Sequence, residues 1–236
     1  MASTQKKNRI FKEMTNVIIT GATGMIGKII LGECIKSPDI HLVTSLVRRP
    51  SGLEHPKLRE VVINDFVTYD DKKELFKYQH MAFYCLGVYT GKVDRKEFRK
   101  ITVDYTKGFA DQLYQQSPDC TVCFLSGAGA DPTEMSRMMF AKDKGAAENY
   151  LLARSFNDLH IFRPAYIYPI KKRDEPNLMY KIMRSLYPLM RKFYPRGVIT
   201  SDQLAEAMFF TGQYGSGKNI YENEEIKELV GTADVS

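Results

Sequence analysis

The stretch NVIITGATGMIG, from Asn16 to Gly27, decides the fold. Its first five residues form a short apolar run, as a strand buried within a parallel sheet requires. Glycines follow at positions 21, 24 and 27, which is a G-x-x-G-x-x-G pattern. Isoleucines then recur at helical spacing from Met25 to Ser37, and Pro38 ends the expected helix. The stretch therefore predicts a strand, a glycine-rich turn and a helix in succession.

A strand, a glycine turn and a helix in this order favour binding of a dinucleotide. Glycine permits the tight turn and lets the backbone approach a pyrophosphate, and the last glycine lets the helix pack closely against the strand. The N–H groups and the dipole of the helix N-terminus stabilise the anion. The next strand ends at Arg48 and Arg49, with no carboxylate there. Because arginine suits a 2′-phosphate and an acid suits ribose hydroxyls, the expected cofactor is NADP rather than NAD.

Strand and helix patterns alternate along most of the chain. Further strands are predicted at 41–47, 59–64, 81–87, 121–127 and 159–164, with helices at 72–78, 95–116 and 135–154. Repeated β-then-α units predict an α/β fold with a Rossmann-like, doubly wound parallel sheet. After Pro164 the pattern changes to a loop, a basic amphipathic helix, a helix near 201–211, a short strand and a tail. We expect one domain over 14–236, in which 165–236 form a small, mainly helical lobe on the substrate side.

Composition and cysteine usage indicate a cytoplasmic protein. The 236 residues are 44% hydrophobic and 26% charged, and no apolar run approaches the ~20 residues of a membrane span. Residues 1–13 are charged and lack an apolar core, so they are expected to be a basic tail rather than a signal peptide, with Met14 a candidate start. The four cysteines form no disulfide framework. Cys120 and Cys123 lie three apart on a predicted strand, so they should point to opposite faces as buried structural residues.

Several motifs together resemble one enzyme superfamily. The glycine turn, Arg48, Asp65-Phe66 after the third strand and Cys85-Leu86-Gly87 after the fourth resemble the short-chain dehydrogenase/reductases. The likeness is to the atypical branch with NAD(P)-binding epimerase-like domains. Matching stretches are YCLGVYTGK (84–92), VDYT (103–106), FLSGAGAD (124–131), KGAAEN (144–149) and FRPAYIYP (162–169). The resemblance implies a Rossmann-like fold and NAD(P)-dependent oxidoreductase activity on a small molecule whose identity stays open.

The same resemblance implies roles for individual residues. The pyrophosphate would be held by Gly21, Thr23, Gly24, Met25 and Ile26, and the 2′-phosphate by Arg48. Asp65 and Phe66 would border the adenine, while Cys85, Leu86 and Gly87 would line the nicotinamide side. Lys144 would reach the nicotinamide ribose, and Pro164, Ala165 and Tyr166 would lie against the carboxamide.

The usual proton donor of this superfamily is missing. Its chemistry rests on a serine and a Tyr-x-x-x-Lys, in which the lysine charge lowers the tyrosine pKa and the phenol exchanges a proton with the substrate oxygen. Ser126 matches the serine and Lys144 the lysine, but the tyrosine position holds Phe140. Tyr150 lies six residues beyond Lys144, so on a helix it should face elsewhere.

Three interpretations of this substitution stay open. Tyr89 or Tyr166, each in a loop after a strand, is the proton donor of a reductase. Alternatively, hydride goes to a quinone or an enone that solvent protonates. In the third interpretation, the protein binds NADP(H) as a regulator or scaffold and catalyses nothing.

A basic amphipathic helix is predicted at 178–194. The formal net charge of +6 is concentrated in residues 171–196. The apolar positions are Met179, Ile182, Met183, Leu186, Met190 and Phe193, and the basic ones opposite are Lys181, Arg184, Arg191 and Lys192. Pro188 is expected to kink or split the helix.

This helix has two interpretations. In the first, its apolar face covers the substrate pocket and its basic face lies in solvent. In the second, the helix contacts anionic lipid or a partner protein. Without zinc-ligand spacing or a nucleic-acid-binding motif, we do not expect nucleic acid, and the oligomeric state stays open.

Overall fold

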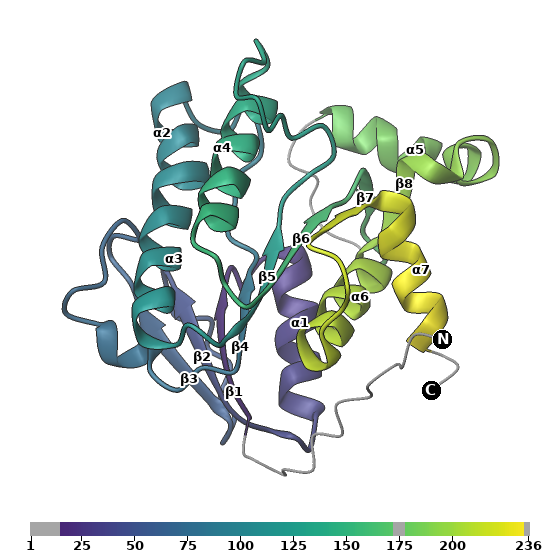
Figure 1. Cartoon of the computed structure of the whole chain (residues 1–236). Coiled ribbons are helices and arrows are strands. Elements are labelled where there is room, and N and C mark those ends of the chain that lie inside the picture. The colour runs from purple at the N-terminus through teal and green to yellow at the C-terminus, as the bar shows by residue number, and fades with distance from the viewer. Residues whose placement is uncertain (1–14, 172–177, 234–236) are drawn as a thin grey trace, which may run out of the picture.

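Strand β1 (Thr15–Thr20) lies inside a seven-stranded sheet, between β2 (Ile40–Val47) and β4 (Met81–Tyr84) (Figure 1). The computed structural model describes residues 15–171 and 178–233. The remaining strands of this sheet are β3 (Leu58–Val62), β5 (Thr121–Leu125), β6 (Asp158–Arg163) and β9 (Ile220–Glu222). Their spatial order is β3-β2-β1-β4-β5-β6-β9, and every neighbouring pair is parallel. The predicted Rossmann-like α/β fold is confirmed.

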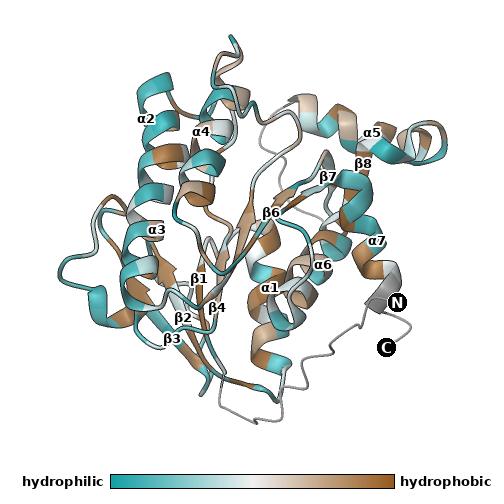
Figure 2. Cartoon of the chain, viewed as in Figure 1, coloured by the Kyte–Doolittle hydropathy of each residue, from teal (hydrophilic) through white to brown (hydrophobic). Residues whose placement is uncertain are grey.

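Helices cover both faces of the sheet, which explains the uninterrupted apolar runs of its strands. In β1, Val17 and Ile19 pack into one buried cluster with α1 (Met25–Lys36) and α6 (Ser201–Tyr214). Ile18 packs into the other cluster, with α3 (Tyr105–Gln116) and α4 (Met139–Ala153). Because successive side chains of a strand alternate faces, both sets must be apolar. Figure 2 shows the strands as hydrophobic and the outward surfaces of α2 and α3 as mostly hydrophilic.

Two predicted helices differ in form from the expectation. The helix expected over 95–116 runs as α2 (Arg95–Arg99), a π-helical segment η2 (Lys100–Asp104) and α3. The helix expected over 72–78 is a short 3-10 helix, η1 (Lys73–Phe76).

Helix α4 begins at Met139 rather than near 135. The side chain of Asp131 accepts the backbone N–H groups of Thr133, Met135 and Ser136. These hydrogen bonds hold the segment before Met139 as a turn, because the short side chain of aspartate can bind nearby backbone N–H groups in place of the hydrogen bonds of a helix.

The C-terminal part of the chain contains more structure than predicted. Strands β7 (Tyr166–Tyr168) and β8 (Val198–Thr200) form a separate parallel pair, joined through α5 (Leu178–Phe193) and η3 (Pro195–Gly197). The expected C-terminal tail contains a helix, α7 (Asn223–Ala233), whose Ile226 is fully buried. Helix α5 continues past Pro188, so the expected split does not occur. The predicted tail at 1–13 and the basic residues Lys172 and Arg173 lie outside the described residues.

The described part of the chain offers no helix of the length and apolar character that a bilayer crossing requires.

Cys120 and Cys123 are fully buried, and burial raises the pKa of both thiols well above the ordinary value. Cys123 belongs to the cluster beneath α1 and α6, and Cys120 to the cluster beneath α3 and α4. The prediction of structural cysteines on opposite faces is confirmed.

Candidate functional site

The glycine turn after β1 needs glycine for reasons that the structure makes explicit. Gly21 has a φ of +73°, and a Cβ there would lie 2.4 Å from the carbonyl oxygen of Cys85. A Cβ on Gly27 would lie 2.3 Å from the carbonyl oxygen of Gly21. Since real Cβ atoms do not approach this closely, a side chain at either position would push α1 or the end of β4 away from the turn.

Gly24 differs from these two glycines. Its φ is −79° and its ψ is 176°, an extended conformation that any residue adopts. A Cβ on Gly24 would meet only the carbonyl oxygen of Gly21, at 3.1 Å. The space beside Gly24 belongs to a cavity, so at this position glycine leaves room for a ligand to approach the backbone.

That cavity lies at the carboxyl ends of β1, β2 and β4. Its lining comprises Gly21, Ala22, Thr23, Gly24, Leu46, Val47, Arg48, Phe66, Cys85, Leu86 and Gly87. Ligands of open parallel sheets bind in this position. We call it the dinucleotide cavity, because its lining combines the phosphate-type turn, Arg48 and the segment after β4. The structure thus brings together most of the residues that the sequence assigned to a dinucleotide.

Four of the assigned residues line neither this cavity nor the aromatic one described next: Ile26, Asp65, Lys144 and Pro164. Asp65 does not line the dinucleotide cavity; its carboxylate accepts the N–H of Val67 and lies 3.8 Å from the Nζ of Lys100. The side chain of Ile26 is buried in the core, so only its backbone can face the turn. The carbonyl oxygen of Pro164 accepts the N–H of Ala128.

A second, aromatic cavity adjoins the start of α1. It is lined by Met25, Tyr89, Ala165, Tyr166, Ile167, Pro169 and Tyr180. The ring centroids of Tyr89 and Tyr180 are 5.1 Å apart, and those of Tyr166 and Tyr180 are 6.4 Å apart. The two candidate donors, Tyr89 and Tyr166, therefore flank one ring. Tyr180 is not among the site residues predicted from the sequence, although its position within the amphipathic helix was the signal that could have identified it.

Phe140 lies at the end of β5, beside Ser126. A Cβ built on Gly127 would be 2.6 Å from the Cζ atom of Phe140, so the tip of the ring points at the residue after Ser126. The superfamily resemblance places a tyrosine hydroxyl in this region. Phenylalanine at this position supplies an apolar ring edge and no proton.

Lys144 lies one helical turn after Phe140 on α4, and its Nζ donates to the carbonyl oxygen of Leu125 at 3.1 Å. Burial lowers the pKa of Lys144 to about 8, and the negative charge of Glu148 opposes part of this change. Burial also raises the pKa of the Cys85 thiol to about 12, so at neutral pH this cysteine is a neutral thiol.

The hydroxyl of Ser126 donates a hydrogen bond to the buried carboxylate of Glu148. Arg163 binds the same carboxylate, and its Nη1 lies 2.9 Å from Glu222. The hydrogen bonds that Arg163 donates to Glu148, and then to Glu222, raise the pKa of its guanidinium. This buried ion cluster was not predicted from the sequence, although Glu148 stands four residues after Lys144 on the same helix.

Tyr150 lies away from this group, as predicted. Its hydroxyl donates to Asp111 of α3 at 2.8 Å, and Arg154 contacts the same tyrosine. Tyr150 therefore joins α3 and α4 on one face of the sheet and does not replace the missing proton donor.

Comparisons with known proteins agree with this fold. No family model matches the chain. The chain is similar to Protein HTATIP2 of Rattus norvegicus, with 27% identity over 163 residues that cover 68% of this chain. The match covers 66% of the rat protein, just under two thirds of its length.

Two solved structures share the fold. An engineered reductase has a TM-score of 0.67 at 15% identity, covering 93% of this chain and 83% of its own. The Bordetella bronchiseptica enzyme WbmH, solved with NAD+, has a TM-score of 0.66 at 16% identity, covering 94% and 82% respectively. The Rossmann-like fold that the resemblance implies is thereby confirmed.

Proposed function

We propose that the protein is an NADP(H)-dependent oxidoreductase that lacks the tyrosine acid usual in its superfamily. The observation that carries the proposal is the dinucleotide cavity, in which Arg48 joins the glycine turn and the segment after β4. WbmH, which shares the fold, was solved with NAD+. These observations support a nicotinamide dinucleotide in the cavity.

Arg48 favours the phosphorylated form of this cofactor. The described lining of the cavity contains an arginine and no acidic side chain. A guanidinium forms charge-assisted hydrogen bonds with a 2′-phosphate, whereas ribose hydroxyls are bound best by a carboxylate. NADP(H) therefore fits the residues present better than NAD(H).

The aromatic cavity is the proposed place for the hydride acceptor. A bound NADPH would supply the hydride. The hydroxyl of Ser126 donates a hydrogen bond to Glu148, and the Nζ of Lys144 donates one to the carbonyl oxygen of Leu125. Since Phe140 offers no proton, an acceptor that takes its proton from solvent suits the site best.

A quinone takes up one hydride and one proton to give a hydroquinone, and an enone takes up the same pair to give a saturated ketone. Tyr89 and Tyr166 would pack against such a planar acceptor, and each remains a candidate donor for a carbonyl substrate.

The same arrangement of Ser126, Phe140 and Lys144 also favours a second function. Ser126 and Lys144 both form hydrogen bonds within the protein itself. A protein with this arrangement can bind NADP(H) without turnover and act as a regulatory or interaction protein. NADPH oxidation measured with carbonyl, enone and quinone acceptors distinguishes the two. Turnover with any of these classes supports the oxidoreductase, and binding of NADPH without turnover across the whole panel supports the regulatory protein.

Cofactor preference tests the assignment of Arg48. In titration calorimetry, Arg48→Ala should weaken NADPH binding about tenfold or more, because a charged hydrogen-bonding group is lost, and should leave NADH binding nearly unchanged. The neighbouring Arg49→Ala is the matched control, since Arg49 does not line the cavity. Equal loss of NADPH and NADH affinity, or tighter binding of NADH by the wild type, would contradict the assignment.

A further inference from the structure

Helix α5 contacts the body of the protein through one narrow side. Tyr187 stacks on Tyr168 with ring centroids 3.6 Å apart, and the Arg184 guanidinium lies 5.7 Å from the centroid of the same ring. Tyr180 packs against Tyr89 at the aromatic cavity. The side of α5 that faces the protein is thus formed largely by two tyrosines and an arginine.

The apolar face expected to cover the substrate pocket mostly faces solvent instead. The exposed apolar side chains of α5 are between 44% and 70% exposed: Met179, Ile182, Leu186, Leu189 and Phe193. They recur at steps of three or four residues, so they form one stripe along a helix about 24 Å long. We call this set the apolar stripe. Of the six apolar residues predicted to cover the pocket, only Met183 and Met190 are partly buried.

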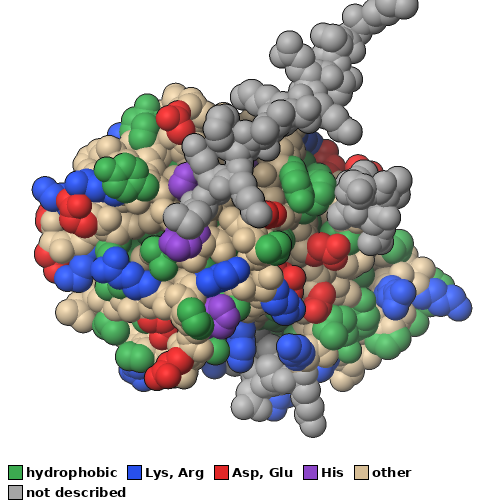
Figure 3. Space-filling model, turned by 90° about the horizontal axis from the view of Figure 1, so that it is seen from below, with side chains coloured by type: hydrophobic (Ala, Val, Ile, Leu, Met, Phe, Trp, Pro, Cys, Tyr) green, Lys and Arg blue, Asp and Glu red, His purple; other side chains and the backbone are tan. Residues whose placement is uncertain are grey.

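Positive charge lies beside the apolar stripe. Lys181, Arg191 and Lys192 are exposed, and the sequence of α5 contains no aspartate or glutamate. In Figure 3 the part of the surface that projects at the right, where α5 lies, shows hydrophobic and basic side chains without acidic ones. Over the rest of that view, basic and acidic side chains are interspersed.

We propose that α5 docks the protein on an anionic membrane surface, with the apolar stripe at the level of the acyl chains. A helix with an apolar stripe, a basic flank and low overall hydrophobicity lies in the plane of the bilayer interface. Phospholipid phosphates and carboxylates complement Lys181 and Lys192, which stand on one edge of the stripe. Phe193 and Tyr194 at the end of α5 supply aromatic rings, which are enriched at membrane interfaces.

Charge argues against a second copy of the chain as the occupant. If two copies met at α5, the basic side chains beside the apolar stripe of one copy would face those of the other. Like charges across an interface disfavour association. The stripe also lies on a convex helix that projects from the molecule (Figure 1), a shape suited to a flat bilayer.

A tryptophan reporter provides a test that does not depend on activity, because the chain contains no tryptophan. Phe193→Trp should shift its fluorescence emission to shorter wavelength when vesicles of phosphatidylcholine with phosphatidylserine are added to the full chain. Tyr78→Trp is the control, since Tyr78 is 79% exposed and precedes β4 at the amino end of the sheet. Its emission should not change.

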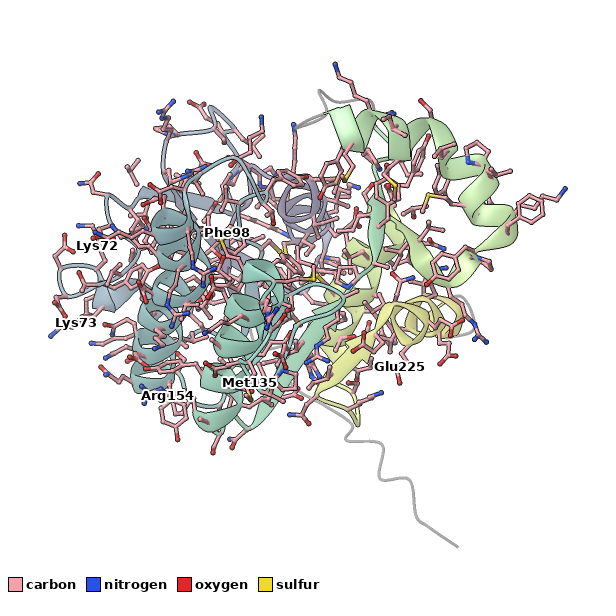
Figure 4. The ribbon with its side chains drawn as sticks, turned by 90° about the horizontal axis from the view of Figure 1, so that it is seen from above. Lys72, Lys73, Phe98, Met135, Arg154 and Glu225 are labelled. Carbon is pink, nitrogen blue, oxygen red and sulfur yellow. The ribbon has the colours of Figure 1, made fainter. Side chains whose placement is uncertain are left out.

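Charge and apolar variants test the two parts of the surface in vesicle co-sedimentation. Each basic side chain near an anionic surface strengthens partitioning about fivefold, so Lys181→Glu with Lys192→Glu should weaken binding at least about 25-fold. The control is Lys72→Glu with Lys73→Glu, which lie on the opposite side of the molecule from α5 (Figure 4). Ile182→Gln with Leu186→Gln should also weaken binding, whereas the exposed apolar pair Val62→Gln with Leu152→Gln should not.

The proposal is supported if the wild type binds phosphatidylserine vesicles, releases them at high salt and loses binding only in the α5 variants. It is overturned if the wild type does not bind such vesicles, or if the control variants lose binding equally. It is also overturned if the α5 variants abolish self-association or binding of an acidic peptide while vesicle binding is absent. NADPH affinity of the α5 variants is measured in parallel, so that failure of the proposed function is distinguished from failure of membrane docking.

Discussion

At the residue scale, Phe140 is the most informative departure from the pattern that the chain resembles. Its ring tip points at Gly127, next to Ser126, and Lys144 follows one turn later. The charged partner of a tyrosine–lysine pair is therefore present, and only the hydroxyl is missing.

Phe140→Tyr should raise NADPH-dependent reduction of a carbonyl that fits the aromatic cavity, by up to roughly 10²–10⁴-fold when the geometry is right. The new hydroxyl requires the ring to tilt away from Gly127 by a small amount, since the tip already lies close to it. Reduction of quinones should change little, which is the internal control. A variant that binds NADPH normally but gains nothing with any carbonyl would show that Phe140 does not occupy the donor position.

At the scale of one element, α4 brings three different side chains to one face. Phe140, Lys144 and Glu148 follow at intervals of four residues, so they line up along the helix beside the end of β5. A lysine held in this partly buried position is costly in its charged form.

Burial lowers the pKa of Lys144 from 10.5 to about 8, so between these pH values the unfolded chain holds this proton more tightly than the folded one. The contribution of Lys144 to the free energy of unfolding should therefore increase as the pH rises from about 8 to about 10.5, by at most about 3 kcal/mol. Urea denaturation of the wild type and of Lys144→Met at pH 7.5 and pH 10 measures this. The wild type should gain free energy of unfolding relative to Lys144→Met, and parallel behaviour of the two proteins would contradict the prediction.

Helix α5 shows what amphipathic spacing leaves open. The spacing correctly predicts a helix with one apolar and one basic face. It does not predict which side of a broad apolar face is buried, because the tyrosines at 180 and 187 share that face with the aliphatic residues. The packing of aromatic rings against Tyr89 and Tyr168 decides the orientation.

At the scale of the whole molecule, one ion cluster joins elements that are distant in the sequence. Arg163 of β6 pairs with Glu148 of α4 and with Glu222 of β9, so it connects the sheet edge with the helix that carries Lys144. Asn223 adds a second connection, because its side chain binds the N–H of Ala165 and the carbonyl oxygen of Val198.

Arg163→Met should lower the free energy of unfolding by about 3–5 kcal/mol, because Glu148 would remain buried without its partner. Arg154→Met is the control, since Arg154 and Asp111 are each 37% exposed, and it should cost about 1 kcal/mol or less. Replacing Glu148 and Glu222 by glutamine together with Arg163→Met should recover part of the loss. Urea denaturation measures all three variants, and equal destabilisation by Arg163→Met and Arg154→Met would refute the role of burial.

The sequence by itself determined the sheet, the glycine turn and the missing acid. Alternation of apolar strands and amphipathic helices is a local, periodic signal, and the positive φ of Gly21 is a local property of the turn that favours glycine. Phe140 is recognisable because its spacing from Lys144 lies within a single helix.

Only the tertiary structure decided which side chains bind one another. The bond of Ser126 to Glu148, the position of Tyr180 between Tyr89 and Tyr166, and the solvent exposure of the apolar stripe all depend on contacts between segments that are far apart in the chain. Such contacts follow from the way helices settle on the sheet, and no local periodicity encodes that arrangement.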